Sequence, residues 1–274
     1  MAPTRLIVTR PSAQADEWVQ QLRALGLCAQ ALPLLGIQTI TDPAPLRAAW
    51  QGLGACALVV FVSPNAVQHF FAARPAAASV AATGWPPGVL AGATGPGTSA
   101  ALRQAGVPAL QLAEPAAEAT LFDSEALWAR LQGRPWAGRR VLVVRGEDGR
   151  DWLADVLRQR GAEVAFVAAY RRVPPVLDIA TQALLASALA EPAAHLWLFS
   201  SSQAVGHLRA LAPAADWSRS RALASHPRIV QAARDAGFGQ VEATAPFPQA
   251  VAAWLAASIQ PSLQTSPSIQ SAPL

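Results

Sequence analysis

Short apolar runs rich in Val, Leu and Ala alternate along this chain with longer stretches of helical periodicity. This alternation is typical of parallel α/β sheets, in which a crossover helix follows each strand. Two sets of five strands predict two similar lobes, each a five-stranded parallel sheet flanked by helices. The ten runs that we interpret as strands cover residues 5–9, 28–32, 58–62, 89–94, 109–112, 141–145, 163–167, 196–199, 222–225 and 241–244.

An internal repeat supports two similar lobes. QLRALG, ending at Gly26, matches VLRQRG, ending at Gly161, and each glycine stands where a helix should end before a strand. The SPNAV and SSQAV segments match in the same order, as do ALRQAGV and AARDAGF. Their nearly constant separation indicates two related halves, although any two strand–helix units share part of this pattern.

Two extended segments that contain prolines mark the predicted lobe boundaries, because proline disfavours a helix there. They predict two linkers that cross between the lobes and together form a two-stranded connection. The predicted ranges are 1–35 with 174–260 for lobe 1, 42–166 for lobe 2, 36–41 and 167–173 for the linkers, and 261–274 for a disordered tail rich in Ser, Pro and Gln.

The charged residues exclude several kinds of chemistry. All 21 basic residues are Arg, against 17 acidic residues, so no P-loop lysine, Schiff base or pyridoxal-phosphate lysine is available. Arginine binds carboxylates and phosphates, which favours an anionic small-molecule ligand. The arginines are scattered along the sequence, so we expect no nucleic-acid partner.

The sequence also lacks motifs for metal binding, covalent catalysis, secretion and membrane insertion. There are two cysteines and no CxxC, HExxH or nucleophile-elbow motif, so we expect no metal and no covalent mechanism. The chain starts without an apolar signal segment, and Gly and Pro interrupt its longest uncharged stretch. We therefore expect a cytoplasmic monomer with no membrane association.

Candidate binding residues follow the predicted strands, because open parallel sheets bind ligands beyond the carboxyl ends of their strands. Helix capping is the alternative role, to which Ser63, Thr98 and Ser202 are well suited. A capped helix still presents free N–H groups to an anion. The candidates are Thr9, Arg10, Ser63, Asn65, Gly95, Thr98, Arg145, Gly146, Ser200, Ser201, Ser202 and His226.

Tyr170 is the candidate catalytic residue. It is the only tyrosine, lies in the second predicted linker beside Arg171 and Arg172, and is expected to face the gap between the lobes. Its phenol can donate a hydrogen bond to a leaving hydroxyl or a carboxylate, and interlobe packing is the alternative role. His69, by contrast, is expected to be structural.

Two other functions remain open on the residues alone. The segment 95–100 matches GxGxxA after a strand, and Glu114 follows the next strand, as in dinucleotide-dependent enzymes. A two-lobed protein that binds a small molecule without chemistry is the second alternative.

Several segments together resemble one family, the uroporphyrinogen-III synthases, over about residues 5–258. The segments are VTRP at 8–11, PLLGI at 33–37, FVSPNAV at 61–67, GPGTSAAL at 95–102, VLVVRGEDGRDWLADVLRQRGAEV at 141–164, AYRR at 169–172, FSSSQAV at 199–205 and SHPRI at 225–229. One departure is Val62, where similar sequences often have Thr before the Ser-Pro-Asn.

The resemblance implies two α/β lobes and a lyase of haem biosynthesis that needs no cofactor. Its substrate would be hydroxymethylbilane, a linear tetrapyrrole with eight carboxylates, which is cyclised with inversion of ring D and loss of water. The resemblance also implies that Tyr170 helps the hydroxyl to depart and that Ser63, Thr98 and Ser200–Ser202 line the cleft.

Overall fold

The computed structural model describes residues 4–75 and 84–259. The predicted disordered tail, 261–274, lies outside these residues. Contacts between Cα atoms divide the chain into two compact units: unit 1 comprises Met1–Leu32 with Asp178–Leu274, and unit 2 comprises Pro33–Leu177. The chain therefore leaves unit 1, builds unit 2 and returns to unit 1.

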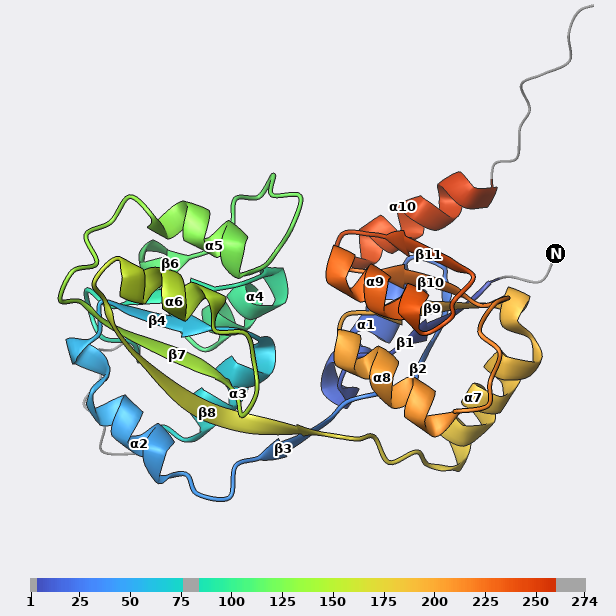
Figure 1. The fold of residues 1–274 in the computed structure, drawn as a ribbon, viewed down its shortest axis with the longest axis horizontal. Helices are drawn as coiled ribbons and strands as arrows, with labels where there is room; N and C mark the ends of the chain where they lie inside the picture. The colour runs from blue at the N-terminus through green and yellow to red at the C-terminus, as the bar shows by residue number, and fades with distance from the viewer. Residues whose placement is uncertain (1–3, 76–83, 260–274) are drawn as a thin grey trace, which may run out of the picture. The chain divides into compact units, whose positions relative to one another are not determined.

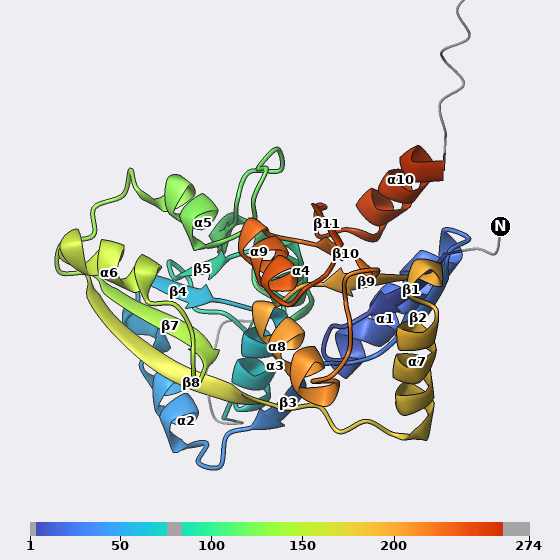
Figure 2. The same cartoon turned by 45° about the vertical axis from the view of Figure 1, so that its right-hand side comes forward.

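Unit 1 contains one parallel sheet, with strand order β11-β10-β9-β1-β2. Helices α8 and α9 lie side by side on one face of the sheet, and α1 packs with α10 on the other (Figures 1 and 2). The strands are β1 (Arg5–Val8), β2 (Cys28–Ala31), β9 (His195–Phe199), β10 (Arg221–Ala224) and β11 (Gln240–Ala243). The helices are α1 (Ser12–Ala24), α7 (Ile179–Ala190), α8 (Ser202–Leu211), α9 (Pro227–Asp235), α10 (Pro248–Ile259) and the 3₁₀ turn Pro192–Ala194.

Unit 2 contains a six-stranded sheet with order β3-β8-β7-β4-β5-β6. Its strands are β3 (Gly36–Thr39), β4 (Leu58–Phe61), β5 (Leu90–Ala93), β6 (Leu112–Ala113), β7 (Arg140–Gly146) and β8 (Glu163–Val173). Its helices are α2 (Ala44–Gln51), α3 (Pro64–Ala72), α4 (Pro96–Gln104), α5 (Ser124–Leu131), α6 (Trp152–Gln159) and the 3₁₀ turns Leu53–Ala55 and Ala109–Gln111.

The two sheets share one topology with different starting points. Read from β2, unit 1 runs β2-β1-β9-β10-β11; read from β8, unit 2 runs β8-β7-β4-β5-β6. In the parallel part of unit 2 the first strand along the chain is β4, which has the position of β9 in unit 1. The α1–β2 segment of unit 1 is therefore equivalent to the α6–β8 segment of unit 2. The internal repeat of QLRALG and VLRQRG pairs these same two segments. Gly26 (φ 79°) and Gly161 (φ 83°) follow the two helices in the left-handed conformation that glycine accommodates.

The predicted pairing of the two linker segments is confirmed: β3 pairs antiparallel with the end of β8, Gly36 opposite Val173 and Thr39 opposite Tyr170. One detail of the strand prediction is wrong. The predicted strand at 109–112 is mostly a 3₁₀ turn, and only Leu112 and Ala113 pair with β5. These two residues form the edge strand of the sheet, where only one neighbour is available.

Alternation along β4 builds the core of unit 2 on both faces of the sheet. Val59 and Phe61 contribute to a buried cluster with side chains from α2, α3 and α4. Leu58 and Val60 contribute to a second buried cluster with side chains from α5 and α6. A strand with apolar residues on both faces is expected where helices cover both sides of a parallel sheet. The equivalent strand of unit 1, β9, is likewise buried along its whole length.

Candidate active site

Each sheet has a topological switch point, and several of the turns with predicted binding residues lie there. In unit 2 the neighbouring strands β7 and β4 lead into helices on opposite faces of the sheet, and in unit 1 β1 and β9 occupy the equivalent places. Ligands of open α/β sheets bind beyond the carboxyl ends of such strand pairs. Ser63 follows β4 and Gly146 ends β7, so both lie at the switch point of unit 2.

A cluster of three polar side chains lies at this point. The Tyr170 Oη and Ser63 Oγ atoms are 3.0 Å apart, and the Arg172 Nη2 donates to the Tyr170 Oη over 3.2 Å. Ser63 also accepts from the backbone N–H of Ala66 over 3.1 Å, which makes it the N-cap of α3. We call Ser63, Tyr170 and Arg172 the hydroxyl cluster.

A β-bulge directs Tyr170 into this cluster. Arg145 pairs with Ala168 but the next residue, Gly146, pairs with Tyr170, so β8 has an extra residue, Ala169, at this step. The bulge changes the alternation of the strand, and the consecutive residues Ala169 and Tyr170 are both buried. Tyr170 therefore belongs to the core of unit 2, with none of its surface exposed (0%), and this differs from the expectation of a residue facing a gap.

The Tyr170 ring is confined by two neighbours. The His69 ring of α3 stacks on it, with centroids 5.9 Å apart and planes inclined by 26°. A Cβ atom at Gly146 would lie only 3.3 Å from the Cε2 and Cζ atoms of the ring. Desolvation by burial lowers the pKa of His69, which favours the neutral imidazole beside the phenol.

The neighbouring turn of unit 2 places Gly95 and Thr98 near the start of α3. Gly95 is the N-cap of α4, and Gly97 approaches Pro64, since a Cβ added there would lie 3.4 Å from its Cγ. Thr98 is buried, with 3% of its surface exposed. The prediction of Thr98 as an N-cap is wrong, because the helix begins earlier, at Pro96, a residue suited to the first helical position.

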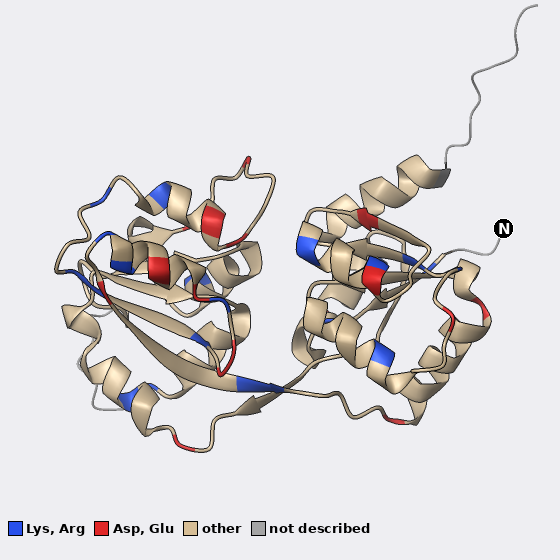
Figure 3. Cartoon of the chain, viewed as in Figure 1, with Lys and Arg blue, Asp and Glu red and all other residues tan. Residues whose placement is uncertain are grey.

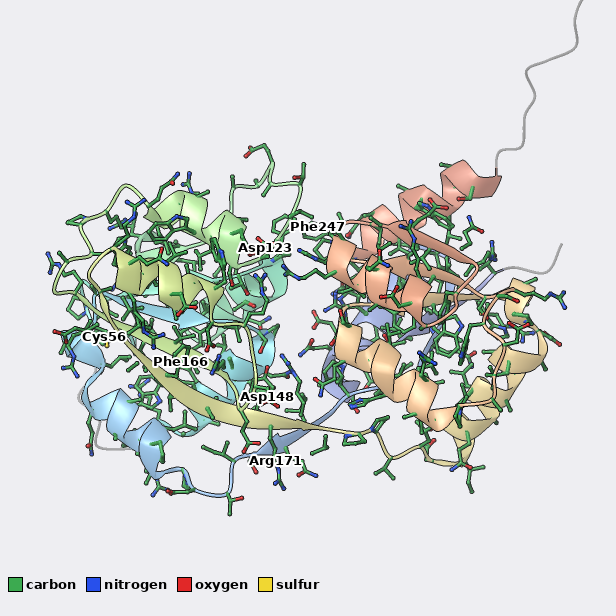
Figure 4. The ribbon with its side chains drawn as sticks, viewed as in Figure 1. Cys56, Asp123, Asp148, Phe166, Arg171 and Phe247 are labelled. Atoms are coloured by element: carbon green, nitrogen blue, oxygen red, sulfur yellow. The ribbon has the colours of Figure 1, made fainter. Side chains whose placement is uncertain are left out.

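Other predicted side chains of unit 2 have partners of their own. Arg145 forms an ion pair with Asp151, and its guanidinium lies 4.1 Å from the centroid of the Phe166 ring, labelled in Figure 4. Asn65 is half-buried in the first turn of α3. Arg171, also labelled in Figure 4, donates to the Gln38 side chain across the β3–β8 pair (3.0 Å).

The switch point of unit 1 carries a buried threonine and a confined arginine. Thr9 is 1% exposed, and its Oγ1 donates to the carbonyl of Leu198 over 2.7 Å, which ties β1 to β9. The Arg10 guanidinium lies 4.2 Å from the centre of the Trp18 ring. Desolvation by burial lowers the pKa of Arg10 to about 10, against the opposing charge of Glu17, so the side chain remains cationic at neutral pH.

Arg10 and Ser200 both line a pocket in unit 1, together with Ser225 and Thr244. This pocket lies at the carboxyl ends of the strands, where the sequence predicts a binding site. An arginine confined against an aromatic ring at such a point is suited to a carboxylate.

Two of the remaining candidates of unit 1, Ser201 and His226, cap helices. Ser201 accepts from the N–H of Gln203 (3.2 Å) at the start of α8, and His226 Nδ1 accepts from the N–H of Arg228 (3.1 Å) at the start of α9. The prediction of Ser202 as an N-cap is wrong by one position, because Ser201 takes that role. The exposed Ser202 donates instead to the carbonyl of Arg228 over 3.5 Å.

Three features concern cofactor binding and the distribution of charge. Among residues 4–75 and 84–259, no group of three His, Cys, Asp or Glu side chains is arranged to hold a metal ion. Glu114, which a dinucleotide would require for its ribose, forms an ion pair with Arg103. Figure 3 shows basic residues distributed over helices, strands and loops of both units.

A model of the family described as uroporphyrinogen-III synthase HemD matches residues 16–253. This chain belongs to the uroporphyrinogen-III synthase family. The family's enzymes are lyases that cyclise hydroxymethylbilane in tetrapyrrole biosynthesis, so the family and activity predicted from the motifs are confirmed, and both alternative functions are set aside.

A sequence relative agrees with the family, and two solved structures have a similar fold. The uroporphyrinogen-III synthase of Salmonella typhimurium is 31% identical over 179 residues, which cover 65% of this chain and 69% of that protein. A mutant uroporphyrinogen III synthase of Thermus thermophilus has a similar fold, with a TM-score of 0.57 at 19% identity, covering 93% of this chain and 98% of that one. The uroporphyrinogen-III synthetase of Helicobacter pylori gives a TM-score of 0.52 at 14% identity, covering 94% and 100%.

The sequence does not predict two residues that contact Tyr170 in the candidate site. Arg172 was noted only as a neighbour of Tyr170, although residues two apart on a strand lie on the same face. His69 was treated as structural, and the sequence carries no signal that its ring meets a tyrosine on a distant strand. The described helices include none that is long and apolar enough to cross a membrane.

Proposed function

We propose that this chain cyclises hydroxymethylbilane into the type III macrocycle, with ring D inverted, and that the hydroxyl cluster of unit 2 assists departure of the terminal hydroxyl. The observation that carries the assignment of the site is the bond between Tyr170 and Ser63, which joins two of the residues that the family resemblance singles out. Arg172 donates to the same phenol and stabilises negative charge that develops on it.

The chemistry needs a shaped site and a proton donor. Loss of the hydroxyl gives an electrophilic azafulvene, and the substituted carbon of ring D attacks it. The spiro intermediate then fragments and recloses. Without a protein, the substrate closes to the type I isomer with no inversion. The protein's contribution is to hold the linear chain in a curled conformation and to assist one bond cleavage, for which no cofactor is required.

We infer that helix N-termini and arginines bind the eight carboxylates. Ser63, Asn65, Gly95, Thr98, Gly146 and Arg145 supply the turns of unit 2, and Thr9, Arg10, Ser200, Ser201, Ser202 and His226 supply those of unit 1. Thr98 and Thr9 are buried, so their side chains shape the turns and their backbones face the ligand. Arg10 is the strongest side-chain candidate, because the Trp18 ring holds its guanidinium in one place.

We also propose that the protein acts as a cytoplasmic monomer without a nucleic-acid partner. The cysteines Cys28 and Cys56 are both free, which suits a reducing compartment. The distribution of arginines over both units supports small-anion binding over a nucleic-acid groove (Figure 3). Light scattering of the purified protein tests the monomer, and a salt-dependent shift with a DNA duplex would contradict the last point.

Isomer analysis tests the reaction. Hydroxymethylbilane is generated in situ, the purified protein is added without metal or cofactor, and the oxidised products are separated into type I and type III uroporphyrin. We expect type III. Type I alone, from protein that is folded by circular dichroism, would refute the proposed function.

A further inference from the structure

The burial of the two hydroxyl groups decides which of them can meet a ligand. Tyr170 has no exposed surface, whereas Ser63, at the start of α3, is partly exposed. We propose that Ser63 donates the proton to the leaving hydroxyl and that Tyr170 is a positioning residue that acts through Ser63. This inference rests on the proposed function.

The direction of each hydrogen bond follows from the donor inventory of the cluster. The Arg172 guanidinium can only donate, so the Tyr170 oxygen accepts from it. If Ser63 also donated to that oxygen, the O–H of the buried phenol would have no acceptor among residues 4–75 and 84–259. A buried donor without a partner is unfavourable. The favoured order is therefore Arg172 to Tyr170 to Ser63.

This order leaves the Ser63 proton free for a ligand. The Ser63 oxygen accepts from the N–H of Ala66 (3.1 Å) and from the phenol of Tyr170 (3.0 Å), so both of its lone pairs are engaged. Its own O–H is then directed away from both partners. Because Ser63 is the partly exposed member of the pair, that O–H is the donor that a substrate can reach.

The surroundings hold this order in place. His69 and Gly146 confine the phenol ring, and the bulge in β8 sets its height in the sheet. The cap bond to Ala66 fixes the Ser63 rotamer at the end of β4. The bond of 3.0 Å therefore joins two side chains that are each positioned independently by the backbone.

The C–O bond of the hydroxymethyl group breaks with its electron pair on the oxygen, which takes the Ser63 proton and leaves as water. The organic product keeps its N–H proton and is therefore the azafulvenium cation. Ser63 regains a proton from Tyr170, and the phenolate is stabilised by Arg172. When the macrocycle recloses, ring D loses its α-hydrogen as a proton, which returns to the phenolate.

A double-mutant cycle on kcat tests the relay in the full chain, with type III product measured from hydroxymethylbilane generated in situ. Ser63→Gly removes the hydroxyl but keeps a residue that is tolerated as an N-cap. We expect Ser63→Gly and Tyr170→Phe each to lower kcat at least about tenfold, the low end of general-acid effects, with KM unchanged. Because Tyr170 acts through Ser63, the double variant should match Ser63→Gly within about threefold.

Two further variants separate proton donation from helix capping. Ser63→Thr keeps both the hydroxyl and the cap, so it should retain at least about a third of the wild-type kcat. Asp178→Gly removes the side chain that caps α7, through the N–H of Thr181, and should leave kcat unchanged. A comparable loss in Asp178→Gly would assign the effect to capping and overturn the proposal.

The cycle itself has two refuting outcomes. If Tyr170→Phe still lowers kcat tenfold in the Ser63→Gly background, Tyr170 reaches the substrate directly. If Ser63→Gly keeps the wild-type kcat, Ser63 is not the donor. Both outcomes presuppose wild-type protein that makes type III, so failure of the proposed function, in which only type I forms, is recognised separately.

Discussion

Replacing Gly146 with alanine tests how tightly the phenol of Tyr170 is held. An added Cβ would lie 3.3 Å from two ring atoms and 3.5 Å from the Tyr170 carbonyl oxygen. Contacts this close require a displacement of a few tenths of an ångström, and the ring is fully buried and has the His69 ring stacked on it. Either the Tyr170 ring must therefore move relative to Ser63, or the backbones of β7 and β8 must move apart at this point.

The magnitude follows from two opposing effects. Overpacking a closed core costs about 1–3 kcal/mol. Removing a glycine from the unfolded chain returns about 0.4–1 kcal/mol. The net loss of about 1 kcal/mol corresponds to a fall in Tm of roughly 2–4 °C for a unit of this size. We expect kcat to fall as well, because the displacement changes the bond between Tyr170 and Ser63.

Thermal unfolding and type III formation are measured in parallel on Gly146→Ala and on a matched variant, Gly149→Ala. Gly149 lies in the loop that follows β7, and a Cβ there would meet only Arg145, at 3.5 Å, an ordinary contact. The control should keep both Tm and kcat. If Gly146→Ala has the same Tm and kcat as the wild type, the Tyr170 ring accommodates the added methyl group without cost. That result would refute the close confinement of Tyr170.

Three further predictions follow from the same unit. Tyr170→Phe should lower kcat at least about tenfold, equivalent to about 1.4 kcal/mol of transition-state stabilisation, and an unchanged kcat would leave Tyr170 a packing role only. Burial lowers the pKa of His69, so the unfolded chain binds a proton at this imidazole more readily, and stability falls as the pH drops below 6.5. The difference in Tm between pH 7.5 and 5.5 should therefore be smaller in His69→Phe than in the wild type. An unchanged difference would exclude His69 as a cause of the loss of stability in acid. Phe70→Ala, at a fully buried ring stacked 4.7 Å from Trp50, should cost about 3–5 kcal/mol in denaturant unfolding, and a loss below about 1 kcal/mol would contradict the packing described.

Local signals in the sequence predict much of the fold. The glycines that end α1 and α6, the apolar runs of the buried strands and the proline segments each act within a few residues, so the parallel sheets and their equivalence are readable. The proline segments also predict the two-stranded connection that β3 forms with the end of β8. The alternative role of Thr98 as an N-cap is wrong because Gly95 is the N-cap of α4, which has no side-chain cap.

The candidate site depends on contacts that no local pattern contains. Ser63 and Tyr170 lie on separate strand–helix units, and their bond requires the bulge at Ala169, which the sequence AAYRR does not reveal. Position and rarity were enough to single out Tyr170 as a candidate. They did not predict that it would be buried, and burial is what gives Ser63 its proposed role.

The insertion of unit 2 between β2 and β9 sets an order of events on the ribosome. All strands of unit 2 have been synthesised once Val173 is added, but β1 still lacks β9, its second neighbour in the sheet of unit 1. At about 5–20 residues per second, synthesis from Leu32 to His195 takes roughly 10–30 s. By the end of that interval all strands of unit 2 have been made, whereas the apolar strand β1 still has one unpaired edge. The half of the protein that is begun first is thus the last to be completed, and its early strands are where a chaperone would be needed.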